Sequence, residues 1–377
     1  MTRIYFVRHA EAEGNLYRIC EGQYNGLLTV HGKAQLPCVS SYFESIHLDA
    51  IYASDLYRAF QTAKAVAAPS GLPVLPRPAL REIHFGQFEG VPWGDIYAAH
   101  PGVRRQIAEE FGAFAAPGGE SVREAVDRLE QEVLQLAARH PGGSIAIVGH
   151  SGAFGALLPT LLQGFESLHA PQYIKNAAVT VVDTDGQNFT LVRHNDCTHL
   201  QGLTDPHPDT HPKIQFSYRC PDARADEAFL RACGEDAWRA VYGNLQLFSG
   251  DRFYANARGM MEADRRNAFV PLADGKPAGL LLLDSRQDDE PDTGHIALVY
   301  LLPAYRGMGL GAQLIGRAVI EYRARGRKTL RLNVASVNKT AQRFYERMGF
   351  RRETPLHKII SRQYVMKLPI AIPQETD

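Results

Sequence analysis

The sequence predicts an α/β protein in two domains, and three observations support this fold class. The chain has 377 residues, more than a single hydrophobic core usually serves. Apolar stretches alternate with helical patterns in the first half, which is typical of a mostly parallel sheet with helices on both faces. A proline-rich stretch at residues 201–213 predicts a stiff linker to a second, mixed α/β half. We therefore expect domains at 1–200 and 214–369 and a tail at 370–377.

The elements of the first half follow from its hydrophobic pattern. Short apolar runs predict strands at Ile4–Val7, Ala50–Ser54 and Ile145–Val148. Helical spacing predicts helices at Thr29–Ile46, Leu56–Ala68 and Glu120–His140, and a further helix from the end of the third strand to Leu162. Thr29 is a plausible N-cap. Two last strands, Val179–Asp183 and Phe189–Arg193, flank a turn sequence and predict a hairpin.

The second half mixes strands and helices in the same way. Strands are predicted at Ile214–Arg219, Gly294–Leu302 and Thr329–Val334, and helices at Asp226–Tyr242, Gly309–Arg325 and Thr340–Met348. Asn267–Leu272 and Pro277–Leu283 flank Asp274-Gly275, which predicts an antiparallel hairpin.

The composition excludes several classes of protein. Hydrophobic residues at 45% and charged residues at 22% are ordinary for a globular chain. Without an 18-residue apolar run or a signal-peptide pattern, we expect no membrane span and a cytoplasmic location. The five cysteines show no CxxC spacing and predict reduced thiols.

Charge is distributed unevenly along the chain. Residues 1–213 carry 16 basic and 22 acidic side chains, and residues 214–377 carry 25 basic and 19 acidic side chains. The basic second half favours an anionic ligand, but the excess is too small for a nucleic-acid surface.

Two histidines follow predicted strands of the first half. Arg8-His9 ends the first apolar run, and His150 ends the run at 145–149. In an open α/β sheet the carboxyl ends of the strands face one crevice, where ligands bind. We therefore expect both histidines in one site, and the pair suggests phosphoryl transfer through a phosphohistidine.

Five sequence blocks around these residues resemble the histidine phosphatase superfamily, which has the phosphoglycerate-mutase-like fold. The blocks occur in the family's order at residues 6–15, 22–29, 52–59, 80–90 and 148–152, and the resemblance covers residues 1 to about 200. It implies a three-layer α/β/α domain. Ala10 departs from the pattern, because a glycine usually follows the histidine.

The resemblance implies a role for each matching residue. His9 is the expected nucleophile, Glu82 the general acid for the leaving alkoxide, and His150 a further donor to the phosphoryl oxygens. The expected phosphate ligands are Arg8, Asn15, Arg58 and the backbone N–H of Ser151. Arginine suits this task because its planar fork binds phosphate bidentately and stays charged. Gly22 and Gln23, with the segment 92–114, are expected to line the substrate pocket.

The same family contains phosphatases and mutases. The block around Glu82 and the compact length of the domain favour a phosphatase, and a phosphoglycerate-type mutase is the alternative. The chain contains no HxH or HExxH spacing, so we expect no metal.

The second half contains a strand, a glycine-rich turn and a helix start at residues 299–311, VYLLPAYRGMGLG. Clustered backbone N–H groups at such a turn can hold a pyrophosphate. This stretch resembles the coenzyme A-binding motif of the GNAT acetyltransferase superfamily, with Leu301 at the usual valine position. A second block at 338–350, NKTAQRFYERMGF, matches another motif of that family.

The GNAT resemblance implies acetyl-CoA as co-substrate and an amine as acceptor. Arg306, Gly307, Gly309 and Gly311 are expected to hold the pyrophosphate. The Leu301 N–H would polarise the thioester carbonyl, Asn338 would contact pantetheine, and Tyr345 would protonate the thiolate. The sequence does not identify the general base; Glu262, Asp264 and His295 are candidates.

Two complete motif sets on one chain suggest a bifunctional enzyme acting on one small-molecule pathway. The alternative is a phosphatase regulated by a GNAT module that senses acetyl-CoA without transferring the acetyl group. A third option, a phosphatase that acts on proteins, has less support because no recognition module is evident. A homodimer is possible.

Overall fold

The computed structural model describes residues 1–204, 214–287, 290–353 and 363–373. The chain forms two compact units, which we describe separately. The first contains residues 1–15, 19–91 and 99–205, and the second contains residues 16–18, 92–98 and 206–377. The predicted domain boundaries remain a prediction, since most of the predicted linker and the end of the predicted tail lie outside the described residues.

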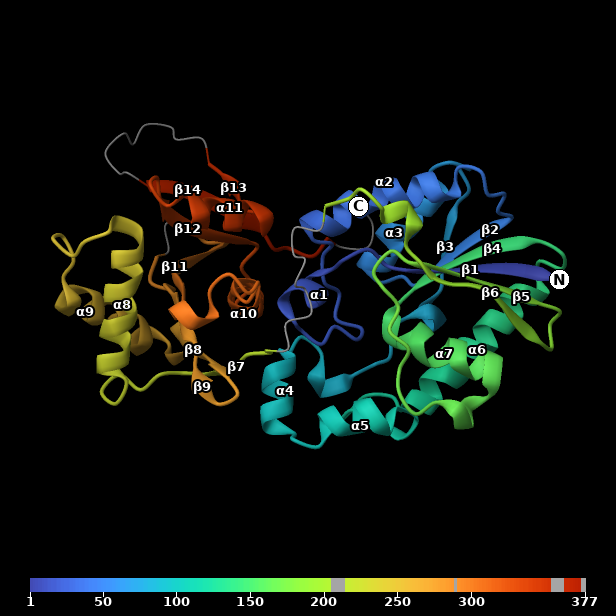
Figure 1. The fold of residues 1–377 in the computed structure, drawn as a ribbon, viewed down its shortest axis with the longest axis horizontal. Coiled ribbons are helices and arrows are strands. Elements are labelled where there is room, and N and C mark those ends of the chain that lie inside the picture. Colours follow the sequence, from blue (N-terminus) through green and yellow to red (C-terminus); the bar gives the residue numbers. More distant parts are fainter. Residues whose placement is uncertain (205–213, 288–289, 354–362, 374–377) are drawn as a thin grey trace. The chain divides into compact units, whose positions relative to one another are not determined.

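The first unit is built on a six-stranded sheet in the order β3-β2-β4-β1-β5-β6 (Figure 1). The strands are β1 (Thr2–Arg8), β2 (Ala50–Ala53), β3 (Val74–Pro76), β4 (Ser144–Gly149), β5 (Val179–Thr184) and β6 (Phe189–Asp196). The four strands β3, β2, β4 and β1 run parallel, β5 is antiparallel to β1, and β6 is antiparallel to β5. β1 and β4 are neighbours, so their carboxyl ends meet.

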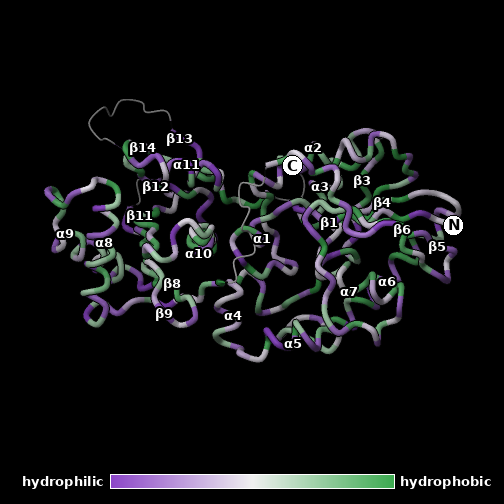
Figure 2. The backbone as a smooth tube through the Cα atoms, in the orientation of Figure 1, coloured by the Kyte–Doolittle hydropathy of each residue, from purple (hydrophilic) through white to green (hydrophobic). Residues whose placement is uncertain are grey.

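Helices cover both faces of this sheet, as predicted. One face carries α2 (Val30–Phe43) and α3 (Tyr57–Ala67), and the other carries α6 (Val122–Ala138) and α7 (Ser151–Gln163) (Figure 1). Alternate residues of β1 enter the two cores: Tyr5 and Val7 pack with α2 and α3, while Ile4 and Phe6 pack with α6 and α7. The apolar sequence of α7 is visible as a largely green stretch in Figure 2.

Side-chain caps fix two of these helix starts. The Thr29 hydroxyl accepts the N–H of Gly32, which confirms the predicted cap of α2. Ser121 and Glu124 form a capping box at the start of α6. Three short helices complete this part of the sequence, namely α1 (Glu13–Tyr17), α4 (Trp93–Ala99) and α5 (Val103–Glu109).

The second unit contains a mixed sheet in the order β13-β14-β12-β11-β10-β8-β7, with β9 paired to β8. Its strands are β7 (Ser217–Arg219), β8 (Ala268–Ala273), β9 (Lys276–Pro277), β10 (Gly279–Leu283), β11 (Thr293–Leu301), β12 (Thr329–Ala335), β13 (Arg351–Arg352) and β14 (Gln363–Pro369). The predicted hairpin turn is confirmed: Asp274 and Gly275 both have positive φ, at 48° and 79°.

Helices pack on both faces of the second sheet (Figure 1). On one face α8 (Glu227–Tyr242) and α9 (Gly250–Ala263) share a core with β8 and β10. On the other face α10 (Gly311–Ala324) approaches closely, because a Cβ on Gly294 of β11 would lie 2.3 Å from the ring of Tyr322. The last helix is α11 (Lys339–Arg347). Throughout the described part of the chain, no helix combines the length and apolar character that a membrane span requires.

Candidate active sites

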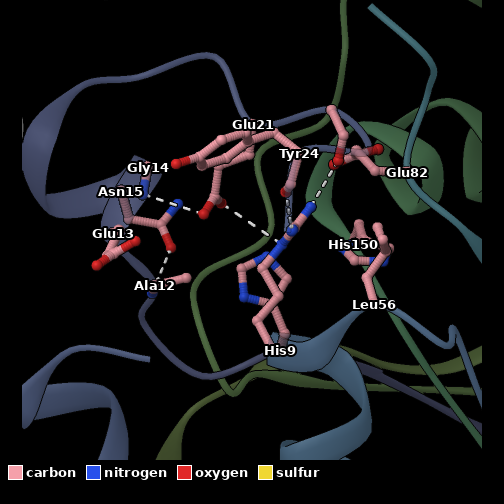
Figure 3. Close-up of polar contacts among 12 residues, drawn as sticks. His9, Ala12, Glu13, Gly14, Asn15, Glu21, Tyr24, Leu56, Glu82 and His150 are labelled. Carbon is pink, nitrogen blue, oxygen red and sulfur yellow. Dashed lines mark hydrogen bonds and ion pairs between the residues drawn. The ribbon is translucent and has the colours of Figure 1, made fainter. Parts of the chain in front are cut away.

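The first candidate site lies where the central strands β1 and β4 end. His9 follows β1, His150 follows β4, and their ring centroids are 5.2 Å apart (Figure 3). Both side chains are buried. The structure therefore brings together two histidines that are 141 positions apart in the sequence. They lie at the carboxyl ends of the strands, where ligands bind in open α/β sheets.

The ring of His9 is held in one tautomer. Its Nδ1 lies 2.7 Å from the carbonyl oxygen of Ala10. A carbonyl can only accept, so Nδ1 carries the proton and Nε2 keeps its lone pair. Burial, together with the charges of Arg58 and Arg8, lowers the pKa of His9 well below its ordinary value. The ring is therefore neutral at pH 7, which is the form that can attack phosphorus.

His150 has the complementary arrangement. Its Nε2 lies 2.8 Å from Oγ of Ser54, which also accepts the N–H of Leu56 at 3.3 Å. When the Ser54 hydroxyl donates its proton to Nε2, the ring proton lies on Nδ1. Among the described residues, that buried Nδ1 has no hydrogen-bond partner. Burial, Arg58 and His9 lower the pKa of His150 as well, so the ring has only this one proton to offer.

Two buried arginines supply positive charge. The Arg58 guanidinium donates to the carbonyl oxygens of Tyr24 at 2.8 Å and Gly22 at 2.6 Å, and Arg8 donates to the carbonyl of Ile174. In the part of the chain that the structure describes, Nε of Arg8 has no hydrogen-bond partner, and Nε of Arg58 faces only the carboxylate of Glu21, without a hydrogen bond. Each guanidinium therefore keeps donor capacity for an anion.

A buried carboxylate lies beside Arg58 (Figure 3). Oε2 of Glu21 is 3.5 Å from Nε of Arg58, and Oε1 accepts the N–H of Gly14 at 3.1 Å. Burial raises the pKa of Glu21 and outweighs the opposing effect of Arg58. Gly14 and Gly26 make room for this carboxylate, since a Cβ on Gly26 would lie 2.4 Å from Oε1.

The side chain of Glu82 lies at the N-terminal end of α7. Its carboxylate accepts backbone N–H groups from Ile83 at 3.0 Å, Gly152 at 3.0 Å and Ala153 at 2.5 Å. A carboxylate is favourable at a helix N-terminus, where unpaired N–H groups and the helix dipole meet it. Since Glu82 uses the amides of residues 152 and 153, only the N–H of Ser151 remains from this helix start for the predicted phosphate contact.

Asn15 and Gln23 also lie at this site. Oδ1 of Asn15 accepts from Ala12 N–H at 3.0 Å and from Nδ2 of Asn176 at 2.9 Å, so its own amide nitrogen is the group that could donate to a ligand. Asn176 also donates to the carbonyl of His9 at 3.1 Å. Gln23 donates to the carbonyl of Glu82 at 3.2 Å, which links a predicted pocket residue to the predicted general acid.

Ala10, the departure from the family pattern, is accommodated without exposure. Its methyl group is buried with Ala12 and Leu28, and its N–H donates to Oγ1 of Thr62 at 3.0 Å. Thr62 in turn donates to the carbonyl of Arg58 at 2.8 Å.

The second candidate site is a cavity of about 850 Å³ in the second unit. The parallel strands β11 and β12 pair only from Thr293 to Ile296 and from Thr329 to Leu332, and the rest of each strand lines the cavity. Leu302 donates its N–H to Ala278 on the β10 side at 2.9 Å. N–H groups alternate along a strand, so that of Leu301 points to the other side, where β12 is no longer paired.

The glycine-rich turn between β11 and α10 also lines the cavity. Gly307 and Gly309 have φ of 74° and 72°, and a Cβ at either would meet no atom within 4 Å. These conformations suit glycine and expose the backbone to a ligand. A Cβ on Gly311 would lie 3.0 Å from the ring of Phe344. The Arg306 side chain turns away to pair with Asp236 and to donate to the carbonyl of Leu301.

Tyr345 and Asn338 lie where the second motif predicts. Both line the cavity, and burial raises the pKa of Tyr345, so its hydroxyl holds its proton firmly. Oδ1 of Asn338 caps α11 by accepting the N–H of Ala341 at 3.0 Å, which leaves its amide nitrogen as the possible donor. Glu262, Asp264 and His295, the candidate bases, do not line the cavity.

Residues 4–197 match the family model described as histidine phosphatase superfamily (branch 1). The chain belongs to this superfamily. Residues 232–350 match the acetyltransferase (GNAT) family model, so the histidine phosphatase domain is followed by a GNAT domain in the same chain. Both predicted resemblances are confirmed.

Known relatives of the histidine phosphatase domain cover about half of this chain. "Putative phosphoserine phosphatase 2" of Hydrogenobacter thermophilus is 29% identical over 54% of this chain and 100% of its own length. "Probable phosphoglycerate mutase GpmB" of Serratia proteamaculans is 31% identical over 53% of this chain and 95% of its own length. A solved mycobacterial glucosyl-3-phosphoglycerate phosphatase is 27% identical, covers 51% of this chain and 98% of that chain, and has a TM-score of 0.48.

The histidine phosphatase domain also contains site residues that the sequence analysis did not select. Ser54, Glu21 and Asn176 each contact a predicted catalytic or binding residue. Ser54 and Glu21 lie inside or beside matching blocks, but a lone serine or glutamate in a sequence does not reveal which residues it contacts in the fold. Within the described residues, no group of three or more His, Cys, Asp or Glu side chains could hold a metal ion.

Proposed function

We propose that this chain hydrolyses a small phosphomonoester through a phosphohistidine on His9 and transfers the acetyl group of acetyl-CoA to a small-molecule amine. The observation that carries the first activity is the neutral His9 ring, whose Nδ1–H is committed to Ala10 and whose Nε2 is free beside Arg8 and Arg58. The two activities serve one pathway, on a substrate with a phosphate ester and an amine.

The phosphatase reaction has two steps. Nε2 of His9 attacks phosphorus, and the P–O ester bond breaks. The leaving oxygen keeps the electron pair of that bond and receives a proton from Glu82. Arg8, Arg58, Asn15 and Nδ1–H of His150 stabilise the charge on the phosphoryl oxygens. Water then attacks the phosphohistidine, returns a proton to Glu82 and releases phosphate. Gly22 and Gln23 contact the rest of the substrate.

A phosphoglycerate-type mutase is the second candidate function, and the name of one relative supports it. One of the relatives named above is a probable phosphoglycerate mutase, while the other two names describe phosphatases. A mutase returns the phosphoryl group to a second hydroxyl of the substrate, whereas a phosphatase gives it to water.

The acetyl transfer uses the cavity of the GNAT domain. Gly307, Gly309 and Gly311 hold the pyrophosphate of acetyl-CoA, and the N–H of Leu301 polarises the thioester carbonyl; the open backbone at Gly307 and Gly309 and the Leu302–Ala278 hydrogen bond support these roles. The neutral amine attacks that carbonyl, the C–S bond breaks, and Tyr345 protonates the departing thiolate. The proton that the amine nitrogen loses passes through water and restores the hydroxyl of Tyr345. Asn338 contacts the pantetheine arm.

A trapping experiment tests the first activity. The full chain is mixed with 4-nitrophenyl phosphate, quenched in alkali and digested, and phosphate on the His9 peptide is sought by mass spectrometry. We expect a +80 Da adduct on His9, a species stable in alkali, and none in His9→Ala. Release of inorganic phosphate from phosphorylated metabolites supports hydrolysis, whereas isomerisation without phosphate release would support the mutase.

Thiol release from acetyl-CoA with a panel of primary amines tests the second activity. His9→Ala should leave this rate unchanged, because the two sites use different residues. Binding of acetyl-CoA without transfer to any amine would instead support the sensor alternative.

A further inference from the structure

One side of the cavity in the GNAT domain is lined by aromatic side chains that the cofactor motifs do not include. We call Trp238, Tyr242, Phe248 and Phe253 the aromatic wall; they come from α8, the loop after it and α9. The cofactor residues Leu301, Gly309 and Tyr345 line the same cavity. A molecule that contacts the wall therefore shares one space with the thioester site.

The rings of the wall pack against one another in sequence. Trp238 and Tyr242 have centroids 4.4 Å apart, Trp238 and Phe248 5.9 Å, and Phe248 and Phe253 6.2 Å, with interplanar angles of 41° to 43°. Phe253 packs closely on α8, since a Cβ on Gly234 would lie 2.5 Å from its ring. The wall is thus a fixed surface with two rotatable bonds per side chain, and a ligand does not have to order it.

The wall is only partly buried. Tyr242 is 38% exposed, and Trp238, Phe248 and Phe253 are partly exposed, unlike Tyr254 of the same helix pair. Removing apolar ring surface from water is favourable, and aromatic pairs gain further from offset or tilted contact. An occupant with a flat ring makes use of both effects.

Charge around the wall argues against a cationic group stacked on its rings. The guanidinium of Arg306 already lies 5.2 Å from the centroid of Tyr300, another lining residue, and it is held there by its ion pair with Asp236. A second cation on this side would meet that charge. The four wall side chains offer ring faces for offset or tilted contact with a neutral ring.

We propose that the aromatic wall is the acceptor pocket of the acetyltransferase and that it selects a primary amine carrying a neutral aromatic or heteroaromatic ring. The ring stacks on Trp238 and Tyr242, and the amine extends toward Leu301 and Tyr345. This inference rests on the proposed acetyl transfer, but ring binding can be measured without it.

The binding test uses tryptophan fluorescence of the full chain. The sequence has two tryptophans, so Trp93→Phe leaves Trp238 as the reporter. With desulfo-CoA present, we titrate 2-phenylethylamine, 2-cyclohexylethylamine, putrescine and ethanolamine, which all carry a primary amine. We expect 2-phenylethylamine to bind at least tenfold more tightly than putrescine and ethanolamine. Equal or tighter binding of the two polar amines would overturn the proposal.

Matched variants locate the effect. Tyr242→Ala should weaken binding of 2-phenylethylamine by about tenfold, a typical loss for one aromatic contact with its buried area. Tyr242→Phe keeps the ring and should bind as tightly as the parent. An unchanged affinity in Tyr242→Ala would contradict the role of the wall, provided the melting temperature matches that of the parent.

The transfer assay separates this inference from the proposed function. With acetyl-CoA, the value of kcat/KM should follow the same order of amines, while the KM for acetyl-CoA stays unchanged in Tyr242→Ala. Ring-selective binding with no acetylated product from any of the four amines would support the acceptor pocket as a binding site and contradict the transferase activity.

Discussion

Oγ of Ser54 lies 2.8 Å from Nε2 of His150, and neither atom is exposed. Ser54 directly follows β2 and His150 directly follows β4, so two neighbouring strand ends create the contact. A neutral imidazole has one N–H, and we infer that Ser54 donates to Nε2 and so keeps that proton on Nδ1. A proton on Nδ1 gives the site a donor next to His9, the proposed nucleophile.

We predict that Ser54→Ala lowers kcat for phosphomonoester hydrolysis by roughly ten- to a hundredfold, somewhat less than the loss of a whole oxyanion donor. Without the hydroxyl, part of the population carries its proton on Nε2 and turns a lone pair toward the phosphoryl group. Ser54→Thr keeps the hydroxyl and should restore most of the rate. Steady-state kinetics on 4-nitrophenyl phosphate measures both variants.

Nitrogen NMR of the histidine side chains distinguishes this positioning role from a structural one. His150 of the parent should show a protonated Nδ1 and an unprotonated Nε2, and Ser54→Ala should show both tautomers. A parent His150 with its proton on Nε2 would show that the serine accepts, and the positioning role would be wrong.

The lowered pKa values of both histidines predict an acid-tolerant phosphatase. His9 must be neutral to attack, and burial with Arg58 and Arg8 keeps its pKa well below the ordinary value. The kcat/KM should therefore stay level as pH falls through about 6.5, the unperturbed value, and decline only at lower pH. Arg58→Gln removes one of these charges and should move the acid limb to higher pH. A parent profile that already falls at pH 7 would contradict the prediction.

The same shifts make stability depend on pH. Below about pH 6.5 the unfolded chain binds protons at positions 9 and 150, whereas the folded chain does not until a lower pH. Stability is therefore complete above that pH and is lost as the pH falls toward the folded pKa. In thermal unfolding, His9→Asn should lose less stability between pH 7.5 and 5.5 than the parent. An equal loss in both proteins would locate the acid sensitivity elsewhere.

Glu21 predicts a gain in anion binding when its charge is removed. Its raised pKa means that the Arg58 ion pair does not offset the cost of burying the carboxylate. Glu21→Gln should therefore be no less stable than the parent at pH 7, and it should bind inorganic phosphate several-fold more tightly, because Arg58 is no longer neutralised. Competitive inhibition by phosphate measures the affinity; weaker inhibition would contradict the argument.

Much of the fold followed from patterns in the sequence. The alternation of buried strands and amphipathic helices predicted the parallel part of the first sheet, and the turn at Asp274-Gly275 predicted the β8–β9–β10 hairpin. The helix α9 and the strand β14 were not predicted. The sequence of α9 mixes small, polar and charged residues and has only three buried side chains, so it shows no clear helical pattern. The residues of β14 form a strand because they pair with β12, which the sequence does not show.

The candidate sites divide in the same way. His9, His150, Arg8 and Arg58 belong to blocks whose resemblance to the histidine phosphatase superfamily implies their roles, and the structure places them together. The contacts of Ser54 and Glu21 depend on which strand ends and loops become neighbours, so no local pattern reveals them. For Glu82, the resemblance implied a general acid, but nothing in the sequence indicated that its carboxylate accepts the amides of α7.

The last prediction concerns the cofactor turn. Gly309 has φ of 72°, and a Cβ there would meet no atom within 4 Å. Gly309→Ala therefore acts through the backbone alone, at a cost of about 1–2 kcal/mol for a left-handed alanine, and should raise the KM for acetyl-CoA roughly five- to thirtyfold. Gly309→Asn should cost less free energy than Gly309→Ala, since asparagine tolerates this conformation.

Gly71, with φ of 68° and equally open space, lies in the histidine phosphatase domain and provides the matched control. Gly71→Ala should lower the melting temperature without changing that KM, and an unchanged KM in Gly309→Ala would mean that this turn does not bind the cofactor.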